Sequence, residues 1–278
     1  QFRQFYYEYQ ITDNKQYALA ANWTYQAFRL TGIGLTMSTR YIDYFEQELV
    51  NVRFTNAAFV ISGTRKRYDF ALNIGATNVK RDTGEDDTGF TGSANFVASL
   101  SSRSSFSALA SSRLTDTSTA AASNAGSIPG SENDIQITTD VIRDTNASLS
   151  YMREDSLLRT SLTARYQEIE YSDNPLDRVV RSLRGQLSYP LTRLLISSAY
   201  VNYRQTKRLD DDRLDNLYVV GGSLNYNFSR KLRGLLDLRY RSNQSNIWWL
   251  YNYDEFSVFA SLVYGFGNVQ RPTRAGGY

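Results

Sequence analysis

Apolar and polar residues alternate along most of this 278-residue chain, and this period of two constrains its fold more than any other feature. A β-strand places successive side chains on opposite faces, so strict alternation predicts strands with one apolar face and one polar face. The segment 158–167 shows the pattern, with Leu158, Thr160, Leu162, Ala164 and Tyr166 alternating with Arg159, Ser161, Thr163, Arg165 and Gln167. Such strands are longer than those of most soluble sandwiches and would expose too much apolar surface in water.

The connections between the alternating segments fall into two length classes. Short turns are predicted at 12–15, 63–66, 101–104 and 190–193, and long polar connections at 81–89, 115–133, 209–215 and 242–254. This asymmetry is typical of outer-membrane barrels, which have short periplasmic turns and long external loops. The Ser/Ala/Gly-rich connection 115–133 is interpreted as a mobile external loop, with a plug inside the lumen as the alternative.

The alternating segments number thirteen and predict a transmembrane antiparallel up-and-down β-barrel of about 12–14 strands in the bacterial outer membrane. They cover 2–11, 16–30, 42–60, 67–80, 89–101, 105–115, 135–152, 157–170, 178–190, 194–208, 216–228, 231–242 and 255–267. Because bacterial single-chain barrels have an even number of strands, either one strand precedes Gln1 or one segment is wrong. The barrel is assigned to 1–266 and a short periplasmic tail to 267–278.

The hairpin around 172–177 offers a test of register. A turn centred between Asn174 and Pro175 places Leu162 beside Leu187 on the apolar face and Arg165 beside Arg184 on the polar face. A slip of one residue would mix the two faces. Two neighbouring arginines repel each other unless an anion or a carboxylate lies between them.

Composition narrows the chemistry further. The chain has no cysteine and no histidine, which excludes thiol and Ser-His-Asp nucleophiles, thiolate metal sites and histidine-ligated haem. We therefore expect a protein that is not an enzyme and has no cofactor and no metal. The net charge of +3 singles out no partner, and no nucleic acid is expected. The chain also lacks an apolar run of the roughly 18 residues that a membrane helix needs.

The polar faces are predicted to line a hydrated lumen. Its charged residues are expected to be Arg159, Arg165, Arg184, Arg204, Arg233, Asp237, Arg239 and Arg241. Guanidinium groups offer planar donors to carboxylates and phosphates, so this set favours a basic conduit for anionic solutes or sugars. The alternative is that each arginine pairs with a carboxylate across the lumen and stiffens a closed barrel.

Aromatic residues are abundant, with 21 tyrosines, and amphipathic rings concentrate at membrane interfaces. Interface anchoring is expected for Tyr171, Tyr189, Tyr203, Tyr226, Trp248 and Trp249, with carbohydrate stacking as the alternative.

The segments 178–208 and 216–241 share a sequence pattern. In LSYPLTR and LNYNFSRKL, a predicted strand ends in an aromatic residue and the chain turns through Thr/Ser-Arg. In this the chain resembles the outer-membrane β-barrels associated with bacterial exopolysaccharide production and export. The resemblance implies a conduit for polysaccharide or anionic solutes. The alternative function is a plugged or partner-filled scaffold barrel that anchors an envelope assembly. Expected partners are outer-membrane lipid or lipopolysaccharide, the transported polysaccharide or anionic solute, and periplasmic or outer-membrane assembly proteins.

Overall fold

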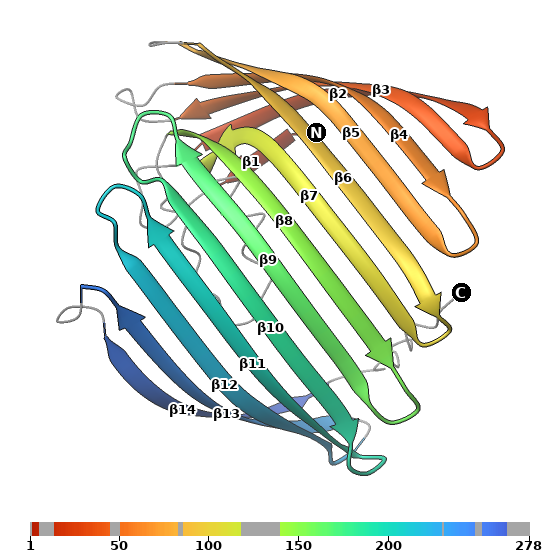
Figure 1. The fold of residues 1–278 in the computed structure, drawn as a ribbon, viewed down its shortest axis with the longest axis vertical. Helices are drawn as coiled ribbons and strands as arrows, with labels where there is room; N and C mark the ends of the chain where they lie inside the picture. The colour runs from red at the N-terminus through yellow and green to blue at the C-terminus, as the bar shows by residue number, and fades with distance from the viewer. Residues whose placement is uncertain are drawn as a thin grey trace.

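The computed structural model describes residues 2–5, 14–44, 51–82, 86–117, 140–229, 231–247 and 252–265. Fourteen strands form one antiparallel sheet in which each strand pairs with the next one in the sequence (Figure 1). The strands are β1 (Phe2–Phe5), β2 (Asn14–Phe28), β3 (Thr31–Tyr44), β4 (Val52–Thr64), β5 (Tyr68–Arg81), β6 (Asp87–Ser101), β7 (Ser104–Asp116), β8 (Val141–Glu154), β9 (Arg159–Tyr171), β10 (Arg178–Pro190), β11 (Leu195–Arg208), β12 (Leu214–Asn227), β13 (Leu232–Ser245) and β14 (Tyr253–Tyr264).

The register keeps the two faces of the sheet chemically separate. Between β12 and β13, Val220 pairs with Tyr240 on the outward face, and Gly221 pairs with Arg239 on the inward face. Val220 and Tyr240 are 53% and 46% exposed, as are many other large apolar side chains on the outward face. A wall with its apolar side chains outside and its polar side chains inside suits a lipid environment, as the alternation predicts. The all-β, antiparallel up-and-down fold is thus confirmed.

The described residues contain fourteen strands, and the predicted strand 42–60 is wrong. β3 ends at Tyr44 and β4 begins at Val52, so the predicted segment merged parts of two strands. Most of β3 was missed because the connection before it, Arg29-Leu30, contains none of the residues that usually mark a turn. The predicted turn 12–15 is also wrong, because Asn14 and Lys15 belong to β2.

The asymmetry of the connections is confirmed. One end of the sheet carries the connections 29–30, 65–67, 102–103, 155–158, 191–194 and 228–231, and the other carries 45–51, 82–86, 117–140, 172–177, 209–213 and 246–252. Since long loops of such barrels are extracellular, we take the second end as the outer mouth.

The register of the β9–β10 hairpin differs from the predicted one by two residues. Arg165 pairs with Ser182 and Arg184 with Thr163, so the predicted Arg165–Arg184 adjacency is wrong. The Asp177 carboxylate accepts a hydrogen bond from the Tyr171 N–H at 2.7 Å, where a ladder partner would otherwise stand. With this hydrogen bond in place, the pairing of β9 with β10 is not centred between Asn174 and Pro175. A shift of two residues leaves both faces unchanged.

The sheet described here is open along one line. Within the described ranges, β14 pairs with β13 alone and has no ladder to β1 or β2. Side chains on both faces of β14 are largely exposed, including Phe256 at 67% and Phe259 at 58%. The curved wall from β2 to β13 therefore positions the candidate site.

Two buried apolar clusters stabilise the outer mouth. The first contains Ile42, Tyr44, Val52, Phe54, Val79 and Val141, and the second contains Ile142, Ile169 and Tyr171. These residues lie where β3, β5 and β9 end and where β4 and β8 begin. Near its outer mouth on this side, the lumen is therefore lined by packed apolar side chains. Farther from that mouth, its wall is more polar.

Asp140 ties the 172–177 connection to the start of β8. Its buried carboxylate accepts hydrogen bonds from the backbone N–H groups of Asp173 and Asn174 and from the Asn174 side chain, at 3.1 to 3.3 Å. Burial raises the pKa of Asp140 above its ordinary 3.8, and the Asp173 carboxylate raises it further, whereas the hydrogen bonds to Asp173 N–H and Asn174 lower it.

The Asp140→Asn variant is expected to change how stability depends on pH. Because the pKa of Asp140 is higher in the folded than in the unfolded chain, its contribution to the free energy of unfolding falls as pH rises above 3.8. Asparagine keeps an acceptor oxygen but does not titrate. The urea midpoint in detergent micelles, measured from about pH 4 to pH 7, should therefore fall less with pH in the variant than in the wild type. A wild-type-to-variant difference independent of pH would contradict this assignment.

Candidate functional site

The inward face of β2–β8 is built from small polar and apolar side chains. Thr36 and Ser38 on β3, Asn56 on β4 and Ser93 on β6 are typical of it. Most of its charges are held in three ion pairs, Arg40–Asp116 at 2.8 Å, Arg81–Asp87 at 2.9 Å and Arg113–Asp144 at 2.9 Å, and Asp69 is a further exposed inward acid. This half of the wall is therefore close to neutral.

The inward face of β9–β13 is basic. The strand register places on it Arg165, Arg178, Arg184, Arg204, Arg208, Arg239 and Arg241. The inward acids on the same strands are Asp215 and Asp237. Asp215 is already bound to Arg213, at 2.8 Å. Cationic groups thus outnumber carboxylates along this half of the wall, and they come from four strands, β9, β10, β11 and β13.

Two of the predicted lumen arginines are also on the inward face but lie at its short-turn end, the inner mouth. Arg159 begins β9 and pairs with Glu154 at 2.7 Å, with both side chains 58% exposed. Arg233 follows the 228–231 turn and donates to Asn227 Oδ1 at 3.1 Å. Arg165, Arg184, Arg204, Asp237, Arg239 and Arg241 lie on the inward face, and their contact with a solute stays a prediction.

Tyr200 links the arginines of neighbouring strands. Its hydroxyl accepts a hydrogen bond from Arg239 Nε at 3.1 Å, and the Arg184 guanidinium lies 5.9 Å from its ring centroid. The ring lies across Gly221, the residue that pairs with both Tyr200 and Arg239. A Cβ atom at Gly221 would overlap Cζ and Oη of Tyr200. Glycine at this position therefore lets Tyr200 reach Arg239, which in turn contacts Asp237 at 3.4 Å.

The Gly221→Ala variant is expected to destabilise the barrel by about 1–3 kcal/mol, because the added methyl group must displace the Tyr200 ring. Gly222 is the matched control. It lies on the outward face, and a Cβ there has its nearest contact at 3.5 Å, with the Ser198 carbonyl oxygen. Urea unfolding of both variants in the same micelles measures the difference. Equal losses of stability in the two variants would show that the Tyr200 ring does not depend on Gly221.

Asp144 organises a second inward cluster. It accepts hydrogen bonds from Arg113 Nη2 at 2.9 Å and from Gln167 Nε2 at 2.8 Å, and it is 3% exposed. Beside it, Arg165 donates to Asn146 Oδ1 at 3.0 Å. The sequence did not single out Asp144, because Asp140, Arg143 and Asp144 made the segment 135–152 irregular. The alternation along β8 could have identified Asp144, since Asp144 and Asn146 lie on the same face of that strand.

Arg178 is one of two inward arginines on β9–β13 that the sequence reasoning missed, the other being Arg208. Arg178 is 5% exposed, and its Nε and Nη2 atoms have no hydrogen-bond partner among the described residues. Its neighbour across the ladder is another inward arginine, Arg208. Its even spacing from Arg184 along β10 was the available signal. A buried guanidinium with unpartnered donors is costly unless water or an anion satisfies it.

The predicted interface residues divide into three groups. Tyr189, Tyr203 and Tyr226 point outward, with Tyr189 42% exposed and the Tyr203 ring 5.1 Å from that of Tyr218. The prediction for Tyr171 is wrong, because this side chain is 7% exposed and packs against Ile142 and Ile169 in the buried cluster. Trp248 and Trp249 lie outside the described residues.

Among the described residues, no helix is long and apolar enough to cross a bilayer. No protein-family model and no curated protein matches the sequence.

Solved structures are similar to this chain at low identity. The FrpB iron transporter from Neisseria meningitidis aligns with 90% of this chain at 12% identity and a TM-score of 0.58. The copper transporter OprC aligns with 90% of the chain at 11% identity and a TM-score of 0.53. This chain covers 47% of each of these transporters. An anion-selective porin from Comamonas acidovorans aligns with 92% of the chain, which covers 91% of that porin, at 9% identity and a TM-score of 0.47. The chain has the fold of the bacterial outer-membrane β-barrels.

Proposed function

We propose that this protein is an outer-membrane conduit whose arginine-lined wall favours anionic solutes. The observation that carries the proposal is the excess of inward arginines over inward acids on β9–β13. Arg178 adds to it, since two donor atoms of this buried guanidinium find no partner in the described parts of the chain. Charge of one sign along a low-dielectric wall raises the local concentration of solutes of the opposite sign.

The guanidinium groups also suit the chemistry of such solutes. A planar fork of N–H donors matches the oxygens of a carboxylate or a phosphate, and it stays charged at any physiological pH. Rings of arginine or lysine are the recurring device of anion pores. The solute class that follows is small carboxylates, phosphates and acidic sugars.

The scaffold alternative requires arginines neutralised by carboxylates across the lumen. Arginine–carboxylate pairs do occur, but Arg40–Asp116, Arg81–Asp87 and Arg113–Asp144 lie on the β2–β8 half of the wall, and the last two join neighbouring strands. On the β9–β13 half, Asp237 faces Arg239 at 3.4 Å, and carboxylates are fewer than arginines. This distribution favours a conduit over a barrel stiffened by internal ion pairs. Passage of an exopolysaccharide stays a prediction from the sequence resemblance.

Liposome swelling with three sugars of one ring size tests the proposal. Glucuronate, glucose and glucosamine carry a negative, a neutral and a positive charge, so differences in their rates isolate charge from size. Vesicles containing the folded barrel should swell fastest in glucuronate and slowest in glucosamine. Equal rates for the three sugars would contradict anion preference, and no swelling with any of them would favour the scaffold.

A further inference from the structure

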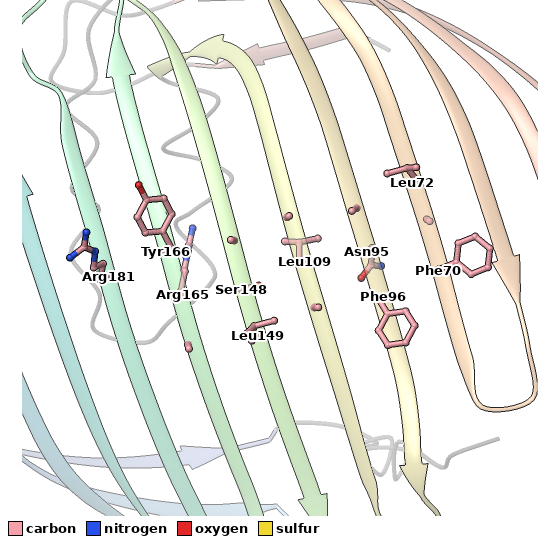
Figure 2. A pocket seen from close by; sticks show the side chains of 16 residues that line it. Phe70, Leu72, Asn95, Phe96, Leu109, Ser148, Leu149, Arg165, Tyr166 and Arg181 are labelled. Carbon is pink, nitrogen blue, oxygen red and sulfur yellow. The ribbon is translucent and has the colours of Figure 1, made fainter.

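An alanine-floored hollow crosses the outward face of the sheet from β5 to β10 (Figure 2). Its volume is about 650 Å³. The register aligns Ala94, Ala108, Ala110, Ala147 and Ala164 on this face of four neighbouring strands. Phe70, Leu72, Phe96, Leu149 and Tyr166 stand around these alanines. Small side chains bordered by large ones leave a trough on the surface that faces lipid.

The hollow runs obliquely through the depth of the membrane. Phe70 is the third residue of β5, close to the short-turn end of that strand. Arg181 is the fourth residue of β10, close to the long-connection end. The trough therefore connects the level of the outer headgroups with the apolar interior, which is the course of a lipid acyl chain.

Arg181 gives the upper end of the hollow a positive charge. It pairs with Tyr166 across the β9–β10 ladder, is exposed on the outward face and lies at the edge of the hollow in Figure 2. The nearby Glu168 accepts a hydrogen bond from the Tyr166 hydroxyl at 2.9 Å. No hydrogen bond or ion pair of the Arg181 side chain occurs within the described parts of the chain. An exposed arginine beside an interfacial tyrosine suits an anionic lipid headgroup.

We propose that this hollow binds a phosphate-bearing lipid of net negative charge from the outer leaflet, with one acyl chain on the alanine floor and a phosphate on Arg181. Charge complementarity at Arg181 selects the headgroup, and the alanines supply the space for the chain. The site lies on the opposite face from the arginine-lined lumen, so it is independent of the proposed conduit.

Native mass spectrometry of the folded barrel with added lipid A tests this site. Wild-type protein in neutral detergent should retain one lipid A molecule in preference to phosphatidylethanolamine. The Arg181→Ala variant should lower that occupancy about tenfold, because it removes a charge-assisted contact to phosphate. The Ala147→Leu variant should lower it as well by filling the floor of the hollow.

The Arg53→Ala variant is the matched control. Arg53 is also outward and exposed, on β4, and does not line the hollow. It should retain lipid A as the wild type does, and all variants should keep wild-type conductance and heat-modifiable mobility. Wild-type occupancy in both Arg181→Ala and Ala147→Leu would overturn the proposal. Equal retention of phosphatidylethanolamine would also overturn it, since that outcome indicates unselective lipid contact.

Discussion

Replacing Arg184 and Arg204 together with alanine is expected to lower the preference of the pore for chloride over potassium about two- to fivefold. The two residues lie on the inward faces of neighbouring strands, where Arg184 pairs with Asn202 and Arg204 with Ser182. Each is partly exposed to the lumen. Removing a unit charge within about 4 Å of a passing ion changes its energy in water by about 1 kcal/mol, which is a factor of about five in local concentration. The reversal potential of the reconstituted protein in a potassium chloride gradient measures the change.

The double variant Arg53→Ala/Lys80→Ala serves as the control for net charge. Both residues point outward, Arg53 from β4 and Lys80 from β5, and they pair with each other across the ladder. This variant removes the same charge from the protein without touching the lumen, so its selectivity should match the wild type. An equal change in both double variants would mean that overall charge, and not the arginine wall, sets the selectivity.

The Asp144→Ala variant is expected to destabilise the barrel by about 2–3 kcal/mol. The substitution leaves the buried Gln167 amide without its acceptor and Arg113 without its ion-pair partner. Most of the expected cost comes from Gln167, which stays buried with an unsatisfied amide, since the Arg113 side chain is 40% exposed and water can solvate it. Urea unfolding in micelles, followed by tryptophan fluorescence, measures the loss.

Glu154→Ala is the matched control for Asp144→Ala. Glu154 forms an ion pair with Arg159 at 2.7 Å, shorter than the Arg113–Asp144 pair, but both side chains are 58% exposed. Exposed pairs contribute about 0–1 kcal/mol, so this variant should unfold close to the wild-type midpoint. A larger effect for Glu154→Ala than for Asp144→Ala would show that burial does not rank these pairs.

The fold class and the faces of most strands could be predicted from the sequence because they depend on parity alone. Arg165, Arg184, Arg204, Arg239 and Arg241 lie inward for this reason. Parity also survives an error of two residues in register, which is why the β9–β10 hairpin kept its faces. Long, regular alternation is a local property, and local properties are what a single sequence reveals most directly.

The pairing partners could not be predicted because they depend on how each turn closes. The Tyr171 N–H donates to the Asp177 carboxylate, and Arg184 pairs with Thr163 rather than with Arg165. Nothing in the composition of 172–177 specified this pairing. Tyr171 was misjudged for a different reason, because the alternation along β9 already places it on the inward face with Arg165, where it packs against Ile142. β3 was missed because Arg29-Leu30 carries no turn signal.

The alanine-floored hollow was beyond the reach of the sequence for a third reason. Ala94, Ala108, Ala147 and Ala164 come from four different strands, and they adjoin only through the lateral register of those strands. Each alanine taken alone is an ordinary small residue on an apolar face. A surface formed by lateral alignment emerges only once every turn has been placed.

Thiol labelling of single-cysteine variants tests most directly the claim that the polar faces line a water-filled lumen. The chain has no native cysteine, so each introduced cysteine is the sole reactive thiol. Ser198 and Ser223 pair with each other on the inward face, and Ala199 and Leu224 are their outward neighbours. In a bilayer, a negatively charged, membrane-impermeant thiol reagent should reduce the current through Ser198→Cys and Ser223→Cys and leave Ala199→Cys and Leu224→Cys unchanged. Equal reaction on both faces, or labelling of the inward positions with no change in current, would contradict the account.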